Sequence, residues 1–526
     1  MHEFQVVLTL LAAVVLVGLV AQRLGLAAPA LLVVGGLVIA LIPGLPRVAF
    51  EPHLIFLIFI PPLLYRAALL ASVRDLRADL RPILQLSVGL VVFTTIVVGV
   101  VAHAVVPALP WGAAFALGAL VSPPDAPAAT AFLRQLVVPR RISTILEGES
   151  LVNDATAIVA YRMAVAAVVT GTFAIGKAAA GFVWVSVVGV AVGLGVGALI
   201  GLARKRVHAP EIEATVSLLT PFAVFLPAEA LGGSGVLAVV AAGLYLGRLG
   251  PRIVAPDTRM QTEGMWGVVG FVLEGLTFIF VGLELRAVLG ELGSYGRTEL
   301  IFAGAAVSFA TILARVGWVF VSSYVGRALA RVMHRRDPFI SWRYVAFVAW
   351  AGLRGADSLV LALALPLTTM SGAAFPGRDL IIFLTYVVIL VTLVAQGFSL
   401  RPIVDWLGIC DTGETRRIEE AHAREQASAA ALRRLDELAT GLDGETVAEL
   451  RSRYGHRQRR FGARVRAERD GAEETLASGR RALLRELLEA ERKAVVDLRD
   501  RGIIGDHVMR RVQRELDLES VLLGSR

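Results

Sequence analysis

The sequence predicts an all-α polytopic membrane protein, with about thirteen transmembrane helices followed by a helical cytoplasmic tail. Of its 526 residues, 56% are hydrophobic, and the mean hydropathy is +0.69. A soluble chain of this length is not so apolar. Apolar stretches of bilayer-spanning length, roughly 20 residues each, recur through the first three quarters of the chain, and the composition changes abruptly after Cys410.

Thirteen apolar spans can be traced before that change. The first follows His2 and Glu3 rather than a basic stretch, so we interpret it as a retained helix and not as a cleaved signal peptide. The spans cover residues 4–22, 26–42, 50–70, 82–106, 111–136, 142–169, 177–203, 211–230, 233–248, 264–284, 299–325, 342–366 and 379–400.

Basic residues are distributed unequally between the loops that join these spans. The loops on the side of the tail hold eighteen Lys and Arg residues, and the opposite loops hold five. Cytoplasmic loops are enriched in Lys and Arg, so we expect the N-terminus outside and the tail in the cytoplasm. The net charge of +8 then reflects topology, and no nucleic-acid partner is expected. The single cysteine, Cys410, excludes an intrachain disulfide and a cysteine-based metal cluster.

Two of the spans are interrupted. The fifth contains Ser122-Pro-Pro-Asp125-Ala-Pro127, whose prolines cannot continue a helix. The twelfth contains glycines and charges in Ala351-Gly-Leu-Arg354-Gly-Ala-Asp357. If spans 1–6 and 8–13 form two halves of inverted topology, each break falls on the fifth span of its half. Interrupted spans at matching positions are typical of a transporter with a binding site at the membrane midplane.

The chain divides at the compositional change into a transmembrane domain, residues 1–408, and a cytoplasmic helical domain, residues 409–526. Residues 411–526 hold 24 Lys or Arg and 23 Asp or Glu, without an apolar run of membrane length. Leucines recur there at helical spacing. The basic stretch from Arg451 to Arg469 is either a solvated helix face or a contact with anionic lipid.

The sixth span carries the carboxylates of Glu147, Glu149 and Asp154. A charge at the bilayer centre costs about 2.5–3.5 kcal/mol even on a lenient insertion scale, so an ion or proton site is the default interpretation. Desolvation disfavours a charged carboxylate. Asp154 near the middle of the span could therefore bind a proton and exchange it for Na⁺ or Li⁺. The alternative is a structural, hydrogen-bonded aspartate. Glu147, nearer the cytoplasmic end, is expected to be solvated.

Three neighbours complete the expected ion and proton site. Asp125 lies at the break of span five, where it either ligates the cation or caps the opened helix. Ser150 precedes Asp154 by one helical turn, so its hydroxyl is a further candidate ligand. Asn153 can satisfy freed backbone groups without adding charge. The predicted ligands of the transported Na⁺ are thus Asp154, Ser150 and Asp125.

Two further charges are expected to form a structural ion pair. A lone arginine inside the membrane needs a partner, so Arg354 in span twelve is predicted to pair with Glu149 in span six. Glu274 in span ten has no assigned partner. Neither a nucleotide-binding Walker sequence nor a serine-hydrolase elbow is present, so we expect a transporter rather than an enzyme, with no cofactor.

These motifs resemble those of the bacterial sodium/proton antiporters of the monovalent cation/proton antiporter-1 family, which includes the NhaP proteins and the sodium/proton exchangers. The matching stretches are Phe59-Ile-Pro-Pro-Leu-Leu, Ser122-Pro-Pro-Asp125, Glu147-Gly-Glu-Ser-Leu-Val-Asn-Asp154, Pro227-Ala-Glu229 with Ser234-Gly-Val-Leu-Ala-Val-Val, Gly352-Leu-Arg-Gly355, and Glu491-Arg-Lys with Leu498-Arg-Asp in the tail. The resemblance implies a homodimer in the bacterial plasma membrane, with a core domain that carries the ion past a dimerisation domain.

The resemblance also implies site roles. Asp154 would be the carboxylate that binds the transported ion or the proton, with Ser150 and Asp125 near the ion. The Asn153-Asp154 pair is the pattern of the electroneutral branch, which exchanges one ion for one proton. The family pairs the glutamate matching Glu149 with the arginine matching Arg354.

Two charges near the site depart from the family pattern. Relatives usually carry an acidic residue where this chain has Arg66, and a small apolar residue where it has Asp357. Our hypothesis is that Asp357 compensates Arg66 or Arg354. The alternative is that the Arg66 side chain extends to the cytoplasmic membrane boundary.

The sequence therefore predicts a secondary antiporter that exchanges Na⁺, with Li⁺ or K⁺ as alternatives, for H⁺ by alternating access, with a role in pH homeostasis. The rival interpretations are a K⁺/H⁺ antiporter, a cation channel, or a membrane sensor that acts through the tail.

Overall fold

The computed structural model describes residues 2–24, 28–41, 52–125, 128–129, 138–171, 175–207, 209–290, 292, 296–332, 341–370, 372–409, 414–439, 443–470 and short stretches between 487 and 517. Regular structure in these residues is entirely helical, apart from an isolated bridge between Thr368 and Ala374. The predicted all-α class is confirmed. Two compact units are present, Met1–Cys410 and Asp411–Arg526.

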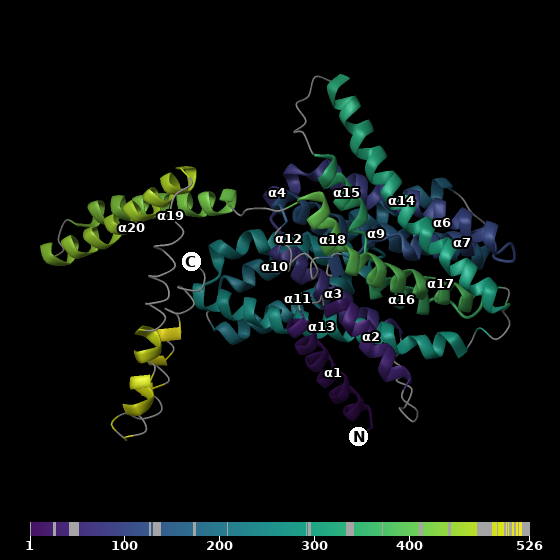
Figure 1. Ribbon diagram of the computed structural model, residues 1–526, viewed down its shortest axis with the longest axis horizontal. Helices are drawn as coiled ribbons and strands as arrows, with labels where there is room; N and C mark the ends of the chain where they lie inside the picture. The colour runs from purple at the N-terminus through teal and green to yellow at the C-terminus, as the bar shows by residue number, and fades with distance from the viewer. Residues whose placement is uncertain are drawn as a thin grey trace. The chain divides into compact units, whose positions relative to one another are not determined.

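The first unit is a bundle of long apolar helices (Figure 1). Its helices are α1 (His2–Leu24), α2 (Ala28–Leu41), α3 (Pro52–Leu70), α4 (Val73–Ala78), α5 (Leu80–Leu84), the π-helical turn η1 (Gln85–Leu90), α6 (Val91–Val105), α7 (Trp111–Val121), α9 (Arg140–Thr170), α10 (Ile175–Arg204), α11 (Pro210–Ala230), α12 (Gly235–Ile253), α13 (Pro256–Gly290), α14 (Arg297–Val332), α15 (Trp342–Trp350), α16 (Ala356–Leu363), α17 (Arg378–Val391), the π-helical turn η2 (Thr392–Gln396) and α18 (Gly397–Leu407).

Nine helical segments within the described residues are long and apolar enough to cross a membrane, and three shorter ones are apolar. The predicted count of thirteen spans is not confirmed by this number and stays a prediction. The two interrupted spans account for part of the difference, because α7 before the first break and α15 and α16 around the second are short. Pro127 and the second half of predicted span five, residues 130–136, lie outside the described residues.

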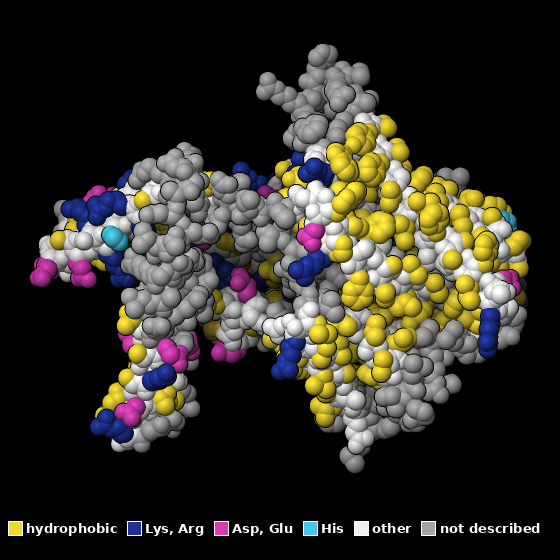
Figure 2. All heavy atoms as spheres, viewed as in Figure 1, with side chains coloured by type: hydrophobic (Ala, Val, Ile, Leu, Met, Phe, Trp, Pro, Cys, Tyr) yellow, Lys and Arg dark blue, Asp and Glu magenta, His cyan; other side chains and the backbone are white. Residues whose placement is uncertain are grey.

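Helix packing in the first unit follows two large apolar cores, beside a small cluster of Phe59 and Val360. One core joins α1, α2, α6, α7, α14, α15 and α17, and the other joins α3, α11 and α12. Helix α9, which carries Asp154, contributes to both. Many large apolar side chains nevertheless point outward, for example Ile301 at 72% exposure, and they cover much of the face seen in Figure 2. Lipid would cover this surface in a membrane.

The second unit contains α19 (Glu414–Leu438) and α20 (Gly444–Asp470), which pack against each other. An exposed ion pair joins them, with Arg451 Nη2 lying 2.5 Å from Asp436 Oδ1. The Arg424 guanidinium also lies 5.4 Å from the centroid of the Phe461 ring. Both helices are rich in charged residues.

Candidate functional site

Two broken helices meet in the first unit. Helix α7 ends at Val121, and residues 122–125 continue without helical structure because Pro123 and Pro124 lack N–H groups. Helices α15 and α16 are separated by residues 351–355. The backbone N–H of Asp125 donates to the carbonyl oxygen of Leu353, with N and O 2.8 Å apart. The two predicted interruptions are therefore real and lie in direct contact.

Side chains form hydrogen bonds with several of the backbone groups that lack a helical partner at these breaks. Asn153 is fully buried on α9, and its Nδ2 donates to the carbonyl oxygen of Pro124 at 2.7 Å. The other break, residues 351–355, is stabilised by hydrogen bonds with side chains of the π-helical turn η2. The backbone N–H of Arg354 donates to Thr392 Oγ1 at 3.1 Å, and Gln396 Nε2 donates to the carbonyl oxygen of Trp350 at 3.2 Å. A π-helical turn of this kind often marks a functional site.

Three aspartates surround the contact between the breaks. Asp125 lies on the first break, Asp154 on α9, and Asp357 in the first turn of α16, and each is half-buried. The Asp125 carboxylate lies so close to Gly355 that a Cβ at that position would collide with Oδ2. Both Asp125 and Asp357 are near enough to Asp154 to interact with it electrostatically. Three like charges in one apolar region strongly favour the arrival of a cation or of protons.

The candidate ligands differ in their surroundings. Asp125 Oδ1 accepts a long hydrogen bond, 3.4 Å, from the N–H of Ala128, which is a helix-capping contact. Ser150 is buried on α9 one turn before Asp154. The buried Asn153 Oδ1 has no hydrogen-bond partner among the described residues. Glu147 is exposed, as predicted.

Among the described residues, no group of three or more His, Cys, Asp or Glu side chains is placed to hold a metal ion. The contact between the two breaks is surrounded by a mixed set of carboxylate, hydroxyl and carbonyl oxygens. Such hard oxygen ligands suit alkali cations, and a loose set suits an ion that must leave again.

The predicted ion pair between Glu149 and Arg354 is wrong. Glu149 accepts two hydrogen bonds from Arg315 of α14, at 2.6 and 2.9 Å. Gly352 permits this approach, because a Cβ there would collide with the Arg315 side chain. Arg354 instead donates from Nη1 to the carbonyl oxygen of Ser122 at 2.7 Å, and it remains near enough to Glu149 for electrostatic attraction.

Arg315 was missed in the sequence although a signal for it was present. It lies in the middle of the predicted span 299–325, and the other residues from Leu300 to Val325 carry no charge. The cost of burying a lone guanidinium should have marked it as a member of the site, as it did Arg354.

The expected compensation of Arg66 by Asp357 is also wrong. Arg66 Nη1 of α3 lies 2.7 Å from Glu274 Oε1 of α13, and the Arg66 side chain is only 13% exposed. An arginine can reach a carboxylate on a neighbouring helix at lower cost than it can remain unpaired in an apolar bundle. Within the described residues, Asp357 forms no ion pair with Arg66 or with Arg354. Glu274 is also near enough to Asp125 to interact with it electrostatically.

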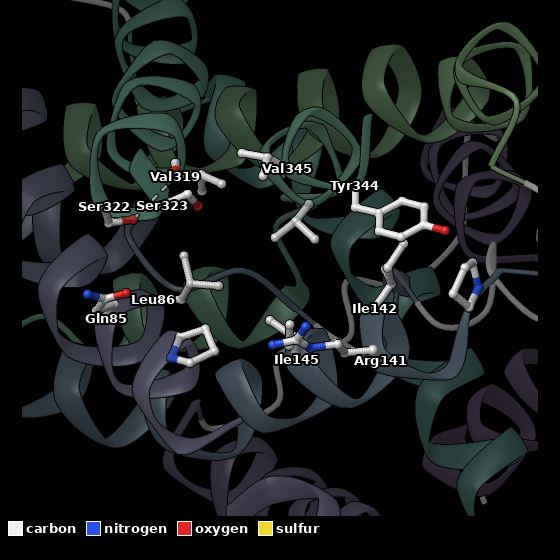
Figure 3. A pocket seen from close by; sticks show the side chains of 13 residues that line it. Gln85, Leu86, Arg141, Ile142, Ile145, Val319, Ser322, Ser323, Tyr344 and Val345 are labelled. Carbon is white, nitrogen blue, oxygen red and sulfur yellow. Dashed lines mark hydrogen bonds between the residues drawn. The ribbon is translucent and has the colours of Figure 1, made fainter. Parts of the chain in front are cut away.

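A small cavity lies beside α9, on the side of its first turns. It holds about 120 Å³ between α5, η1, α9, α14 and α15, and Figure 3 shows Leu86, Ile145 and Val345 around it. Ile145 of its lining lies about one helical turn before Glu149 on α9. Val348, also in the lining, is the residue whose carbonyl oxygen accepts a hydrogen bond from Arg315. The cavity thus approaches the buried ion pair but does not include the three aspartates.

Known proteins resemble this chain over three quarters of its length or more. An uncharacterized Na(+)/H(+) exchanger of Mycobacterium tuberculosis is 37% identical over 533 residues, covering 98% of this chain and 96% of the relative. The Escherichia coli protein YjcE, also described as an uncharacterized Na(+)/H(+) exchanger, is 32% identical over 91% of this chain and 90% of its own length. A sodium, potassium, lithium and rubidium/H(+) antiporter of Bacillus subtilis is 33% identical over 75% of this chain and 60% of its own.

The fold is similar to that of a solved structure. The sodium proton antiporter MjNhaP1 of Methanocaldococcus jannaschii superposes with a TM-score of 0.61, at 18% identity, over 77% of this chain and 99% of that one. The model of the transmembrane sodium/hydrogen exchanger family matches residues 9–406. With its two broken helices in contact beside Asp154, this multi-pass membrane protein belongs to the sodium/hydrogen exchanger family.

Proposed function

We propose that this chain is a secondary antiporter that exchanges Na⁺ for H⁺ across the bacterial plasma membrane. The observation that carries the proposal is the position of the Asp154 carboxylate, on an apolar helix beside two opened helices. The names of the relatives, which are Na⁺/H⁺ exchangers and antiporters, support the same reaction. The chain would be a transporter rather than an enzyme, and it would need no cofactor beyond the transported ions.

The chemistry follows from competition for one carboxylate. A negatively charged Asp154 in apolar surroundings is unfavourable alone, so it binds either a proton or a cation. Ser150, Asp125 and the carbonyl oxygens freed by the breaks would complete the coordination of Na⁺ in the second case. Since Asn153 adds no charge, one cation would replace one proton and the exchange would be electroneutral. Alternating access would then move the loaded site between the two sides.

K⁺ is a second candidate for the transported cation. The relatives from Bacillus are described as sodium, potassium, lithium and rubidium/H(+) antiporters, and the oxygen ligands of the site are hard donors suited to all four ions. We propose the same site for each of them.

The decisive experiment measures proton movement in everted membrane vesicles on addition of Na⁺, Li⁺ or K⁺. Collapse of a preformed pH gradient is expected for the native chain. Asp154→Asn, which is nearly isosteric, should abolish it, while the matched change Asp405→Asn at an exposed position of α18 should leave it intact. Retention of exchange by the Asp154→Asn variant would falsify the assignment of the carrier carboxylate.

We also propose that the exchange is electroneutral, that the tail is cytoplasmic and that the chain forms a homodimer. An imposed membrane potential should not change the rate of an electroneutral exchanger. Cys410, the single cysteine, lies where the transmembrane part ends, so an impermeant maleimide should label it in everted vesicles and not in intact cells if the tail is cytoplasmic. We propose a homodimer, which cross-linking in membranes would test.

A further inference from the structure

A second, wider groove lies on the outside of the first unit, away from the aspartates. It has a volume of about 670 Å³ and runs along α4, α5 and η1 beside Trp318 of α14. Its lining includes two arginines, Arg77 and Arg81, and an apolar stretch formed by Leu84, Val88 and Trp318. Volumes of about 300–1,000 Å³ are typical of ligand sites.

The wall of this groove is built by specific contacts. The π-helical turn η1 begins at Gln85, whose carbonyl oxygen accepts a hydrogen bond of 2.9 Å from Trp318 Nε1. Gly89 permits the close approach of the indole, because a Cβ at that position would collide with it. The ring of Phe93 also packs against Trp318, with the two ring centroids 5.2 Å apart. Trp318 is therefore held in place and the groove is preformed.

The charged side chains of the groove lie at one end of it. Arg77 lies near the end of α4 and Arg81 lies in α5, and both side chains are exposed near the start of the candidate span Leu80–Val105. The nearby carboxylates of Asp75 and Asp79 are each engaged by an arginine of α9, at 2.6 and 2.8 Å. The mouth of the groove is thus basic, whereas the part that extends along the span is apolar.

A basic mouth at a membrane boundary and an apolar furrow along the span complement an amphiphile with an anionic head. We propose that this groove binds one anionic phospholipid of the cytoplasmic leaflet, with its phosphate at Arg77 and Arg81 and an acyl chain against Leu84, Val88 and Trp318. The choice of leaflet rests on the proposed orientation of the chain. Basic residues at the cytoplasmic surface attract anionic lipids in general, and here a shaped furrow adds selectivity for a lipid.

The lipid would stabilise the helix that carries the ion site. The other face of this region packs on α9, where Ile83 of α5 and Leu76 of α4 lie against Gly148. A ligand that binds only the folded state raises its stability. We therefore expect the bound lipid to raise the melting temperature of the whole transporter.

The test uses full-length protein in neutral detergent, with phosphatidylglycerol or phosphatidylcholine added. Phosphatidylglycerol should raise the melting temperature more than phosphatidylcholine does, and native mass spectrometry should show the lipid retained. The double variant Arg77→Ala/Arg81→Ala should lose most of this difference. A matched double variant, Arg248→Ala/Arg252→Ala, removes two exposed arginines at the end of α12 and should keep it.

A third variant tests the furrow. Val88→Phe leaves both arginines in place and fills the apolar part, so it should also lose the lipid effect. Equal losses in the two double variants would show a general charge effect and overturn the proposal, as would no loss in the Arg77→Ala/Arg81→Ala variant. Inorganic phosphate is the last probe. If it gives the same shift as phosphatidylglycerol, the site is an anion site only and the lipid assignment is wrong.

Discussion

Arg315 donates from its two terminal nitrogens to the two carboxylate oxygens of Glu149, at 2.6 and 2.9 Å, and both side chains are only 1% exposed. The same guanidinium donates to the carbonyl oxygen of Val348 at 3.1 Å. One arginine of α14 thus ties the ion-site helix α9 to α15, whose end forms one of the two breaks. The pair therefore holds α9, α14 and α15 together in the part of α9 that precedes Asp154.

Breaking this pair should destabilise the protein strongly. Arg315→Leu removes both hydrogen bonds from Arg315 to the buried Glu149 carboxylate and leaves only the more distant Arg354 to balance its charge. Breaking a buried pair typically costs about 3–5 kcal/mol. We expect a large loss of folded protein in a thermal melt followed by gel filtration. The half-exposed pair between Arg162 and Glu229, with side chains 52% and 31% exposed, is the control, because surface pairs contribute about 0–1 kcal/mol. Similar losses for Arg315→Leu and Arg162→Leu would contradict this role.

The contact between Gly355 and Asp125 should be essential for exchange. In Gly355→Ala the new Cβ would collide with Asp125 Oδ2. Either the Asp125 carboxylate or the backbone of the two breaks must then move, which changes their positions relative to Asp154. We expect exchange in vesicles to fall at least tenfold at equal expression, since an active-site displacement of about 1 Å can cost a hundredfold in rate.

The matched control for that change is Gly317→Ala on α14. A Cβ at Gly317 would meet no atom within 4 Å, and alanine is favoured over glycine in a helix interior by roughly 0.5–1 kcal/mol. This variant should exchange normally and melt no lower than the native chain. If Gly355→Ala also exchanged normally, the close packing of the two breaks would not matter for transport.

The interruptions could be predicted from the sequence, and the ion-pair partners could not. Pro123 and Pro124 have no backbone N–H group, whatever surrounds them in the fold. Their interruption of the helix is therefore a local effect that can be predicted from the sequence. Either Arg315 or Arg354 could have been the partner of Glu149. Helix packing decides which guanidinium comes within 3 Å of the Glu149 carboxylate, and it brings Arg354 to the carbonyl of Ser122 instead. Sequence shows that each buried charge needs a partner but not which helix supplies it.

The same limit explains the error at Arg66. Its partner, Glu274, was visible as an intramembrane carboxylate, but the two residues are 208 positions apart. Their pairing depends on α3 and α13 lying side by side, which periodicity within one helix does not determine. The location of Asp357 near Asp125 and Asp154 likewise follows from the meeting of the two breaks.

The hydrogen bond from Asn153 to Pro124 should contribute measurably to stability. Asn153→Ala leaves the buried carbonyl oxygen of Pro124 without this donor, and such a loss typically costs about 1–3 kcal/mol. We expect a lower melting temperature for the purified protein. Thr156→Val, which removes a hydroxyl bonded only to a carbonyl of its own helix, should cost less. An equal or larger effect of the threonine change would mean that the capping of the break is unimportant.

Acid should loosen the start of α20 in the second unit. Backbone and side-chain hydrogen bonds from Thr446, each 3.1 Å to Asp443 Oδ2, lower the pKa of the exposed Asp443. Because the folded pKa lies below the unfolded one, the stabilisation is present above the usual pKa of aspartate and is lost as the pH falls through the lowered value. Hydrogen exchange of the Thr446 amide, corrected for the intrinsic pH dependence, should show protection falling in that acidic range. Asp443→Asn keeps an acceptor without a titrating charge, so its protection should be constant with pH, and a persistent fall in this variant would assign the effect to another group.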